Sequence, residues 1–447
     1  MNLLKMKNIY KVGMISLGCP KNQVDGEIML RKLADAGFQI VSEIQDSDVM
    51  IVNTCGFIDD AKTEAIETIL EVAEYKAAGL ISAIVVTGCL AERYQDEVFK
   101  ELPEVDAVIG IGSNKDIVKV CQKALVGVKT GSFENKCYLP IDDKRILSTP
   151  SHWAYLKIAE GCDNRCAYCA IPEIRGRFRS RKMESVIAEA KELAKGGVKE
   201  IILIAQDTTK YGQDIYGEYK LDELLKQLVL IDGIEWIRLF YCYPHRITDS
   251  LIDVIANEEK VCKYIDIPLQ HGSNRVLKSM NRYGTVEDYR ALITKMREKI
   301  PGLSLRTTFM VGFPGETEED FEQLCDFVKE IKFEKMGCFS FSPEENTPAI
   351  KMDNQIDEDV KKRRNEVLMN TQYYITEEAN KKRIGNTYKV IVDSFDGENY
   401  VGRSYMDSPE IDSGIIFTSD DKLKIGSFVN VKITSLDGYD LIGERVL

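Results

Sequence analysis

Hydrophobic residues in the first 125 positions form short continuous runs, and between the runs apolar positions recur every three or four residues. The runs VGMISLGC, DVMIVNTC, SAIVVTGC and VDAVIGIG are typical of buried strands, and the stretches between them of amphipathic helices that end near Gly37 and Gly79. Continuous apolar strands alternating with helices indicate a parallel sheet covered on both faces. Residues 1–125 are therefore predicted to form a parallel αβα domain.

A second series of strands and helices follows a stretch without sustained periodicity, which we interpret as a linker over residues 126–150. Its six apolar strands are AYLKIAE, EIILIAQ, IEWIRLFY, YIDIPLQ, LSLRTTFMVG and KMGCFSFS. Six such units predict a partial (β/α)6 barrel of parallel strands over residues 151–355. Functional residues of such a barrel gather at the carboxyl ends of its strands.

The C-terminal part of the chain changes character twice. Residues 356–383 have a long, highly charged helical pattern and are predicted to be a solvated helical connector. Residues 384–447 contain five short strand candidates separated by Asp-Gly and Gly-Ser turns, which predicts a small antiparallel β-barrel of the OB type. The fold class is thus α/β with a terminal β-barrel.

Composition limits the cellular compartment and the partners that are expected for this chain. It has 12 cysteines, 44% hydrophobic residues and a formal net charge of −13. It contains no apolar run of the length that a membrane span needs, and its N-terminus lacks the pattern of a signal peptide. We therefore expect a cytoplasmic protein whose thiols are free, metal-bound or catalytic. The negative charge argues against a protein that wraps nucleic acid by bulk electrostatics.

Three cysteines follow the first strand of the predicted barrel with the spacing C-x3-C-x2-C. They are Cys162, Cys166 and Cys169, called here the barrel set. Thiolates this close can face one metal centre. Zinc is one alternative, although a closed zinc site wants four ligands and the chain offers only three histidines to complete it. A 4Fe-4S cluster held by three cysteines would instead leave one iron open to a substrate or cofactor, and we favour this interpretation.

Three further cysteines each end an apolar strand of the first domain. They are Cys19, Cys55 and Cys89, called here the auxiliary set. Their separations match one strand-helix unit, and equivalent strand ends lie on the same edge of a parallel sheet, so the three thiols can converge. Free buried cysteines are the alternative. We predict a second cluster, again with three protein ligands.

The chain resembles the methylthiotransferases of the radical S-adenosylmethionine superfamily over essentially its whole length. The matching stretches are LGCPKNQVD at 17–25, NTCGF at 53–57, TGCL at 87–90, GCDNRCAYC at 161–169 and PLQHGS at 268–273. The resemblance implies an N-terminal methylthiotransferase domain, a radical core, a terminal TRAM domain and two 4Fe-4S clusters. It also implies that one S-adenosylmethionine donates a methyl group to sulfur at the auxiliary set. A second would be cleaved at the barrel set to a radical that abstracts hydrogen from the substrate carbon.

The resemblance also suggests where the barrel binds S-adenosylmethionine. The candidates are Tyr168, Gly197, Gln206, Arg306 and Gly312. Tyr168 would lie against the adenine, with simple packing as the alternative, while the glycine pair at 196–197 could equally be a helix stop. The run RGRFRSR, from Arg175 to Arg181, could pair with a carboxylate or phosphate at the barrel mouth or be solvated surface.

Members of the family modify either an adenosine beside the tRNA anticodon or the β-carbon of an aspartate in small-subunit ribosomal protein twelve. GRSYMDSPEID at 402–412 and YCYPH at 241–245 resemble the second branch. Residues 384–447 carry 6 Lys and Arg against 11 Asp and Glu, which suits a basic protein better than RNA. Asp407, Glu410 and Asp412 are the predicted substrate contacts, with a solvated loop as the alternative.

Two other functions remain open at this point. One is a tRNA-adenosine methylthiotransferase, and the other is a non-catalytic metal-bound scaffold for ribosome assembly, which would release no 5′-deoxyadenosine. The partners expected with the favoured function are the ribosomal protein and a low-potential electron donor of the flavodoxin or ferredoxin type. We expect a monomer without a membrane partner.

Overall fold

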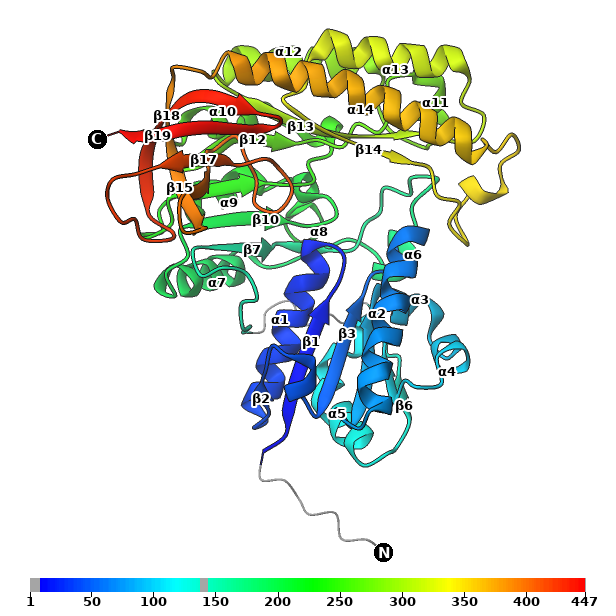
Figure 1. Cartoon of the computed structure of the whole chain (residues 1–447). Helices are drawn as coiled ribbons and strands as arrows, with labels where there is room; N and C mark the ends of the chain where they lie inside the picture. The colour runs from blue at the N-terminus through cyan, green and yellow to red at the C-terminus, as the bar shows by residue number, and fades with distance from the viewer. Residues whose placement is uncertain (1–8, 137–143, 447) are drawn as a thin grey trace, which may run out of the picture.

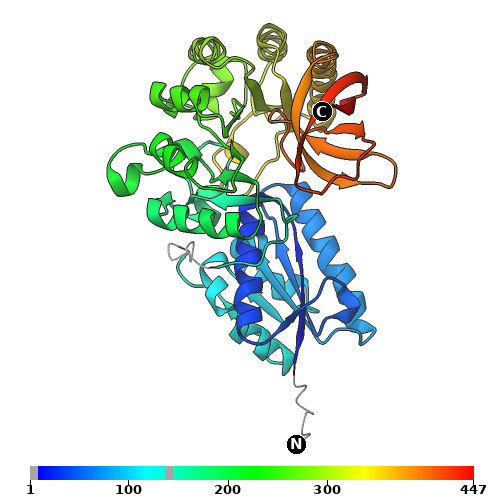
Figure 2. The same cartoon turned by 90° about the vertical axis from the view of Figure 1, so that its left-hand side faces the viewer.

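The computed structural model describes residues 9–136 and 144–446. The N-terminal α/β domain lies below a second, larger α/β part, and the small C-terminal barrel packs against the side of that second part (Figure 1). In the turned view the helices of the second part form an arc around the outside of its sheet (Figure 2). None of the helices in these described ranges is both long and apolar enough to cross a membrane.

The first sheet is parallel throughout, with the strand order β2-β1-β3-β4-β5-β6. The four predicted strands are β1 (Lys11–Ser16), β3 (Val49–Thr54), β4 (Ala83–Gly88) and β5 (Ala107–Ile109). The helices are α1 (Pro20–Asp35), α2 (Asp59–Ala77), α3 (Cys89–Tyr94), α4 (Glu97–Glu101) and α5 (Ile117–Leu125). Separate apolar clusters pack α1 with α5 and α2 with α3 against the sheet. The predicted αβα domain is confirmed.

Two short strands at the edges of this sheet were not predicted. They are β2 (Gln39–Ile40) and β6 (Thr130–Ser132), and β6 falls within the stretch interpreted as a linker. Backbone pairing with β5 defines β6, whose TGS sequence has no apolar run to indicate a strand. Residues 137–143 of the predicted linker lie outside the described residues.

The second sheet has six parallel strands, as predicted, and their order is β14-β13-β12-β11-β10-β7. They are β7 (Trp153–Lys157), β10 (Glu200–Ile204), β11 (Trp236–Leu239), β12 (Val261–Asp266), β13 (Ser304–Val311) and β14 (Lys335–Ser340). The helices are α6 (Ile171–Arg175), α7 (Met183–Lys195), α8 (Gln213–Tyr216), α9 (Leu221–Leu228), α10 (Asp249–Asn257), α11 (Asn274–Ser279), α12 (Val286–Lys299) and α13 (Glu318–Ile331). A small antiparallel pair, β8 (Ala159–Glu160) and β9 (Arg179–Ser180), flanks the cysteine loop. Because β7 and β14 lie at opposite edges, the barrel is incomplete.

Side chains alternate between the two faces of this second sheet, as period-two strands require. Leu156, Ile237 and Ile265 belong to the large apolar core beneath the outer helices. Tyr155 and Tyr264 belong instead to a smaller cluster on the inner face, which also contains Val24 and Ile28 of α1. The N-terminal domain therefore packs against the concave side of the incomplete barrel.

The long helix α14 (Glu358–Lys381) confirms the predicted helical connector, but the expectation that it is fully solvated is wrong. It packs against β14 and α13, and it buries Leu368 and Ile375 in the main core. Arg364 of this helix pairs with buried Glu316 at 2.8 Å. The buried stripe contains few apolar residues and several paired polar ones, so its sequence pattern is that of an exposed helix.

The C-terminal domain is a closed five-stranded barrel, as predicted. Its strands are β15 (Thr387–Phe395), β16 (Tyr400–Arg403), β17 (Ile415–Thr418), β18 (Phe428–Asp437) and β19 (Asp440–Val446). Four strand pairs are antiparallel, and β17 and β19 close the barrel as a parallel pair.

The connection between β16 and β17, residues 404–414, is called here the interior loop. It leaves the small barrel and packs on the second sheet at the end opposite to the cysteines. Asp407 pairs with Lys335, the first residue of β14, at 2.8 Å. Arg403, just before the loop, pairs with Glu200, the first residue of β10, at 2.6 Å. The interior loop thus covers the amino ends of the barrel strands.

Candidate active site between two cysteine sets

The barrel set lies in the loop that follows β8 at the mouth of the incomplete barrel. The backbone N–H of Asn164 donates to Cys162 Sγ at 3.4 Å, and the Arg282 guanidinium donates to Cys166 Sγ at 3.7 Å. Burial raises the pKa of Cys162 to about 12. A buried thiol approached by cationic and N–H donors is a site that would accept metal in place of the proton.

The auxiliary set lies at the carboxyl edge of the first sheet, where the strand pattern predicted it. Cys19 caps α1 after β1, Cys55 follows β3, and Cys89 begins α3 after β4. Gly18 has φ +85°, and a Cβ there would lie 2.7 Å from Cys55 Cβ. A glycine before the first cysteine therefore permits the close approach of the β1 and β3 ends.

Two buried cations flank the auxiliary set. Arg175 Nη2 donates to Cys89 Sγ at 3.4 Å, so the helix that follows the barrel set contacts a cysteine of the other set. Burial would raise the pKa of Cys19, but the Lys21 ammonium and the Arg175 guanidinium outweigh it and lower that pKa. At the other two thiols burial outweighs the cations and raises the pKa, to about 12 for Cys89, so the cations favour anionic sulfur at Cys19.

A buried network of four charges joins the two α/β parts. Arg175 donates to Asp25 of α1 at 2.6 Å and to Glu160 at 3.1 Å. Lys157 of β7 also pairs with Asp25, and it pairs with Glu160 at 3.0 Å. Gln206 completes the network by donating to Glu160 at 2.6 Å. The network is neutral as a whole, which is how such charges are tolerated in a buried interface.

Lys21 of α1 crosses the same interface to the end of β11. Its ammonium lies 3.5 Å from the centroid of the Tyr241 ring, a cation–π contact. Tyr241 has φ 58°, which is rare for an aromatic residue, and its N–H donates to Asp266 at 3.0 Å. Asp266 in turn pairs with Arg306 at 3.1 Å. The strained backbone of Tyr241 at the barrel mouth is therefore held in place by Asp266 and Arg306 on the inner face of the sheet.

Three of the predicted S-adenosylmethionine contacts lie on the inner side of the barrel. Tyr168 is buried beside Cys166 and Cys169 in a cluster with Phe313. Gln206 follows β10 and bonds Glu160, while Arg306 of β13 points inward to Asp266. Their roles in binding the cofactor stay predictions.

The two predicted glycine contacts have structural constraints of their own, and their roles in binding the cofactor stay predictions. Gly197 is exposed between α7 and the start of β10, at the strand end opposite to the cysteines, and its φ of +99° ends the helix. Gly312 follows β13, but its N–H already donates to Glu316 at 2.7 Å, and a Cβ there would meet the Lys361 side chain of α14. Helix termination and close packing account for these glycines, and neither constraint is specific to ligand binding.

The predicted substrate contacts lie in the interior loop, at the end of the barrel opposite to the barrel set. Asp407 is 2% exposed and paired with Lys335, so its side chain holds the loop in place. The Asp412 side chain is 4% exposed and accepts from the Tyr264 hydroxyl at 2.8 Å. Glu410 is exposed and accepts from Tyr155 at 2.9 Å, so it is the member of the three that a partner could reach.

The arginine run RGRFRSR is divided between two environments. Arg175 and Arg181 are buried and pair with carboxylates, Arg181 with Glu189 of α7. Arg177 has a side chain that is 86% exposed. The predicted pairing with a carboxylate therefore applies to Arg175 and Arg181, whose partners belong to the protein itself. The alternative, solvated surface, applies to Arg177.

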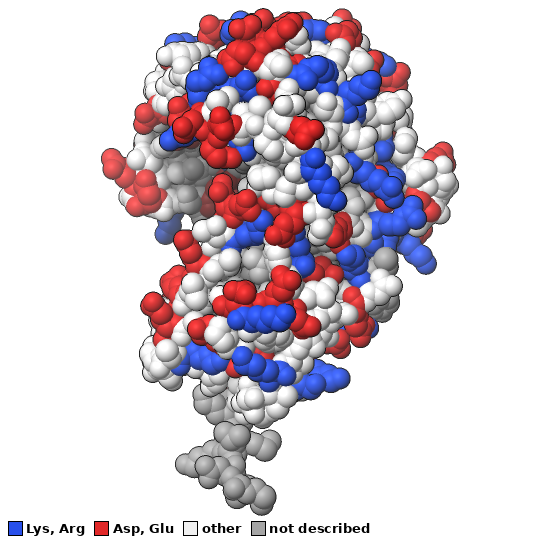
Figure 3. Space-filling view, turned by 90° about the vertical axis from the view of Figure 1, so that its right-hand side faces the viewer, with Lys and Arg blue, Asp and Glu red and all other residues white. Residues whose placement is uncertain are grey.

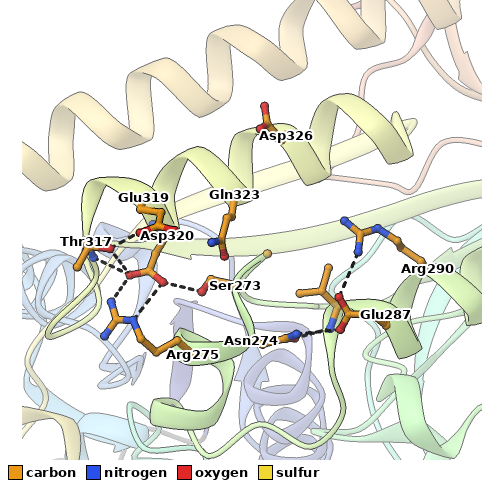
Figure 4. Close-up of a pocket in the computed structure, with 12 residues that line it drawn as sticks. Ser273, Asn274, Arg275, Glu287, Arg290, Thr317, Glu319, Asp320, Gln323 and Asp326 are labelled. Atoms are coloured by element: carbon orange, nitrogen blue, oxygen red, sulfur yellow. Dashed lines mark hydrogen bonds and ion pairs between the residues drawn. The ribbon is translucent and has the colours of Figure 1, made fainter.

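A separate cleft of about 640 Å³ opens between α11, α12 and α13 (Figure 4). Arg275 and Asp320 meet across one end of it, and Asn274 and Glu287 pair at the other. Its lining includes neither cysteine set nor any residue predicted to bind S-adenosylmethionine.

Each set supplies three thiols, which is the donor chemistry of an iron-sulfur cluster. Within residues 9–136 and 144–446, no three His, Cys, Asp or Glu side chains converge closely enough to hold one metal ion. A zinc site would need such convergence, whereas each thiolate of a cluster binds a different iron. All 11 cysteines in the described ranges are free thiols, and cationic donors approach both sets.

Sequence patterns did not single out several residues of this site. Lys21 and Asp25 lie within the quoted stretch LGCPKNQVD, and Glu160 directly precedes GCDNRCAYC. The signal that could have identified these three residues is a charged side chain inside an otherwise apolar or cysteine-bearing stretch. Tyr241 lies in the quoted stretch YCYPH but was assigned no role, and Arg282 had no such signal, because the contacts of both depend on how the chain folds.

Comparison with known families matches three parts of the chain. Residues 11–110 match the uncharacterized protein family UPF0004, residues 156–328 the radical SAM superfamily, and residues 384–446 the TRAM domain. A radical SAM domain implies S-adenosylmethionine and a 4Fe-4S cluster.

Relatives are similar over nearly the whole chain. A ribosomal protein uS12 methylthiotransferase from Desulforamulus reducens is 51% identical over 438 residues, which cover 97% of this chain and 99% of the relative. The chain belongs to the ribosomal protein uS12 methylthiotransferase family. A second family member, from Clostridioides difficile, is 49% identical over 98% of this chain and 99% of its own length.

Solved structures with lower identity share the fold of this family member. A radical S-adenosylmethionine methyltransferase from Kitasatospora setae, with cobalamin and a 4Fe-4S cluster bound, aligns with a TM-score of 0.58 at 16% identity and covers 77% of each chain. The cobalamin-dependent S-adenosylmethionine radical enzyme OxsB aligns with a TM-score of 0.51 at 15% identity, covering 83% of this chain and 56% of the other. At these identities the likeness shows the arrangement of the two α/β parts and no more.

Proposed function

We propose that this protein transfers a methylthio group to the β-carbon of an aspartate of ribosomal protein uS12, in the cytoplasm, with two 4Fe-4S clusters. The observation that carries the proposal is the contact of Arg175, in the helix that follows the barrel set, with Cys89 of the auxiliary set, in a chain about half identical to members of the uS12 family. When bound, the barrel-set cluster and S-adenosylmethionine would supply radical chemistry, and the auxiliary-set cluster would hold the sulfur.

The protein's own residues fix the position of the two cysteine sets relative to each other. Arg175 and Lys157 bind Asp25 on one side of the interface. On another side, Glu344 after β14 accepts from Arg93 of α3 at 2.6 Å and from Lys62 of α2 at 3.1 Å. Ion pairs at two places limit movement of the auxiliary set relative to the barrel mouth, as chemistry between two centres requires.

The charge of the molecule supports a protein substrate over RNA. Acidic and basic side chains are interspersed over the face shown in Figure 3, and the C-terminal domain has an excess of acidic residues. Basic residues gathered in a stripe would be needed for affinity that rests on phosphate contacts. A basic ribosomal protein is a better electrostatic match. A low-potential flavodoxin or ferredoxin as electron donor and a monomeric state complete the proposal.

A direct test offers the anaerobically reconstituted protein each substrate in turn. With reductant and S-adenosylmethionine, we expect a mass increase of uS12 by one methylthio group and release of 5′-deoxyadenosine. A methylthiolated tRNA nucleoside with unmodified uS12 would instead identify the tRNA-adenosine activity. Absence of 5′-deoxyadenosine with either substrate would support the non-catalytic scaffold.

The two cluster sites are tested separately by changing each cysteine set to alanine. We expect each triple variant to lose about half of the iron and sulfide bound by the parent protein. Cys338→Ala, at a half-buried cysteine of β14 outside both sets, is the control and should retain full iron. Full iron in the variant of Cys19, Cys55 and Cys89 would refute the second cluster.

A further inference from the structure

One buried cation at the interface has no carboxylate partner among the described residues. Lys21 is 7% exposed. Among the described residues its ammonium contacts the Tyr241 ring and lies near the Cys19 thiol, and no carboxylate pairs with it. A buried ammonium without a carboxylate is costly, since such charges are normally paired. Apart from the neighbouring Cys19 thiol, the described residues supply no anion to Lys21, so its ammonium can receive one from a bound ligand.

Other buried cations near this interface already form ion pairs with carboxylates. Arg175 and Lys157 share Asp25 and Glu160 within the neutral network. Arg246 pairs with Asp207.

Two more cations on the barrel side are also engaged. Arg306 pairs with Asp266 and lies 3.6 Å from Asp412. Arg282 donates to the Pro268 carbonyl and to Cys166 Sγ, so it is held within the barrel beside the barrel set. Lys21 is thus the cation at the auxiliary side of the interface whose charge remains available.

Tyr241 holds this ammonium in place. The residue keeps a left-handed backbone, with φ 58°, at the end of β11. Its N–H is fixed by Asp266, which is fixed by Arg306 on the inner face of the barrel. Strain of this kind persists when its surroundings enforce it, and it is common at binding sites. The ring therefore positions the Lys21 ammonium between the auxiliary set and the barrel mouth.

We propose that Lys21 binds the side-chain carboxylate of the substrate aspartate and that Tyr241 positions it. This inference rests on the function proposed above. In an aspartate the carboxylate is bonded directly to the β-carbon, so a cation that holds the carboxylate also places the β-hydrogens relative to the two cysteine sets. Adenosine has no carboxylate, so the same lysine would select for the protein substrate. Recognition of the charged group makes Lys21 a residue that determines specificity.

The competing role for Lys21 is to balance the charge of the auxiliary set itself. That role and substrate recognition make different predictions. A lysine that acts only on the cysteine set affects every substrate equally, whereas one that binds the carboxylate distinguishes aspartate from asparagine. A double-mutant cycle between enzyme and substrate separates the two roles.

The experiment measures the dissociation constants of two uS12 peptides for the anaerobically reconstituted full-length enzyme. One peptide contains the target aspartate, and the other has asparagine in its place. The enzymes are the parent protein, Lys21→Gln, Lys21→Arg and the control Lys119→Gln, which makes the same change at an exposed position of α5. Iron content and the spectrum of each reduced cluster are recorded for every variant.

We expect the parent and Lys119→Gln to bind the aspartate peptide at least about tenfold more tightly than the asparagine peptide, because a hydrogen bond to a charged partner is strong. Lys21→Gln should reduce this preference to within about twofold, and Lys21→Arg should restore part of it. If Lys21→Gln weakens both peptides equally, or alters only iron content and cluster spectra, the inference is wrong. Failure of the parent to methylthiolate the aspartate peptide would instead refute the proposed function.

Discussion

Replacing Arg175 by methionine should disconnect the two α/β parts, and the structure allows the cost to be worked out. The side chain is 1% exposed and donates to Asp25 at 2.6 Å and to Glu160 at 3.1 Å. Without it, two carboxylates that are almost fully buried share Lys157 as their remaining cation. Removing one partner from a buried ion pair costs about 3–5 kcal/mol because the other charge stays desolvated.

Hydrogen exchange of α1 and α6 under native conditions measures this cost where it arises, since unfolding of a multidomain chain need not be two-state. We expect the opening free energy of α1 in Arg175→Met to fall by about 3–5 kcal/mol, up to the limit set by its parent value. The control Arg177→Met, whose side chain is 86% exposed, should change it by less than about 0.5 kcal/mol.

A compensating substitution tests the stated cause. If uncompensated charge is what destabilises Arg175→Met, then adding Glu160→Gln removes one buried negative charge and should recover part of the loss. A reduction below about 1 kcal/mol in the single variant, or no recovery in the double variant, would refute the electrostatic account of the interface.

Two further predictions concern the C-terminal domain and α14. Burial alone would raise the pKa of Asp407, but the Lys335 ammonium reverses this and lowers it to about 2, so its contribution is present above about pH 4 and is lost as the pH falls toward 2. Asp407→Asn should therefore reduce the opening free energy of β14, measured by hydrogen exchange, by about 2 kcal/mol at neutral pH. The difference from the parent protein should disappear in acid, and a constant difference would contradict the assignment. Gly312→Ala adds a Cβ 2.2 Å from Lys361 Cγ at φ +74°, whereas Gly315→Ala has a similar φ of +77° and open space. We expect a thermal stability loss about 1–3 kcal/mol larger for Gly312→Ala, and equal losses would show that Lys361 simply moves aside.

The sequence predicted most of the strands because burial on both faces leaves a continuous apolar run, and strand ends then located both cysteine sets. It did not locate β2 and β6, whose edge positions need only backbone pairing. The periodicity of α14 also failed to predict that this helix is partly buried. Ion pairs such as that of Arg364 with Glu316 bury polar side chains, and in a sequence these cannot be told from exposed ones.

Charged residues of the site were harder to predict than its thiols. Arg175 and Arg177 are two positions apart in one basic run, yet one is buried and the other exposed. Their difference depends on the N-terminal domain, more than a hundred residues away in sequence, which supplies Asp25 and Cys89. For the same reason the acidic residues of the interior loop appeared to be surface contacts, although Asp407 and Asp412 have partners inside the barrel.

The interior loop has a consequence for the order in which this chain is made. It comes from residues 404–414, after all six barrel strands, so the amino ends of those strands stay uncovered until this later segment has been synthesised. Near the amino ends of β10 and β11, Glu200 and Arg238 form an ion pair with each other at 2.8 Å. Beside this salt bridge the unfinished chain also exposes Trp153 and Trp236, which the C-terminal domain covers through Ile391 and Phe428, so folding of that domain removes an apolar surface from water.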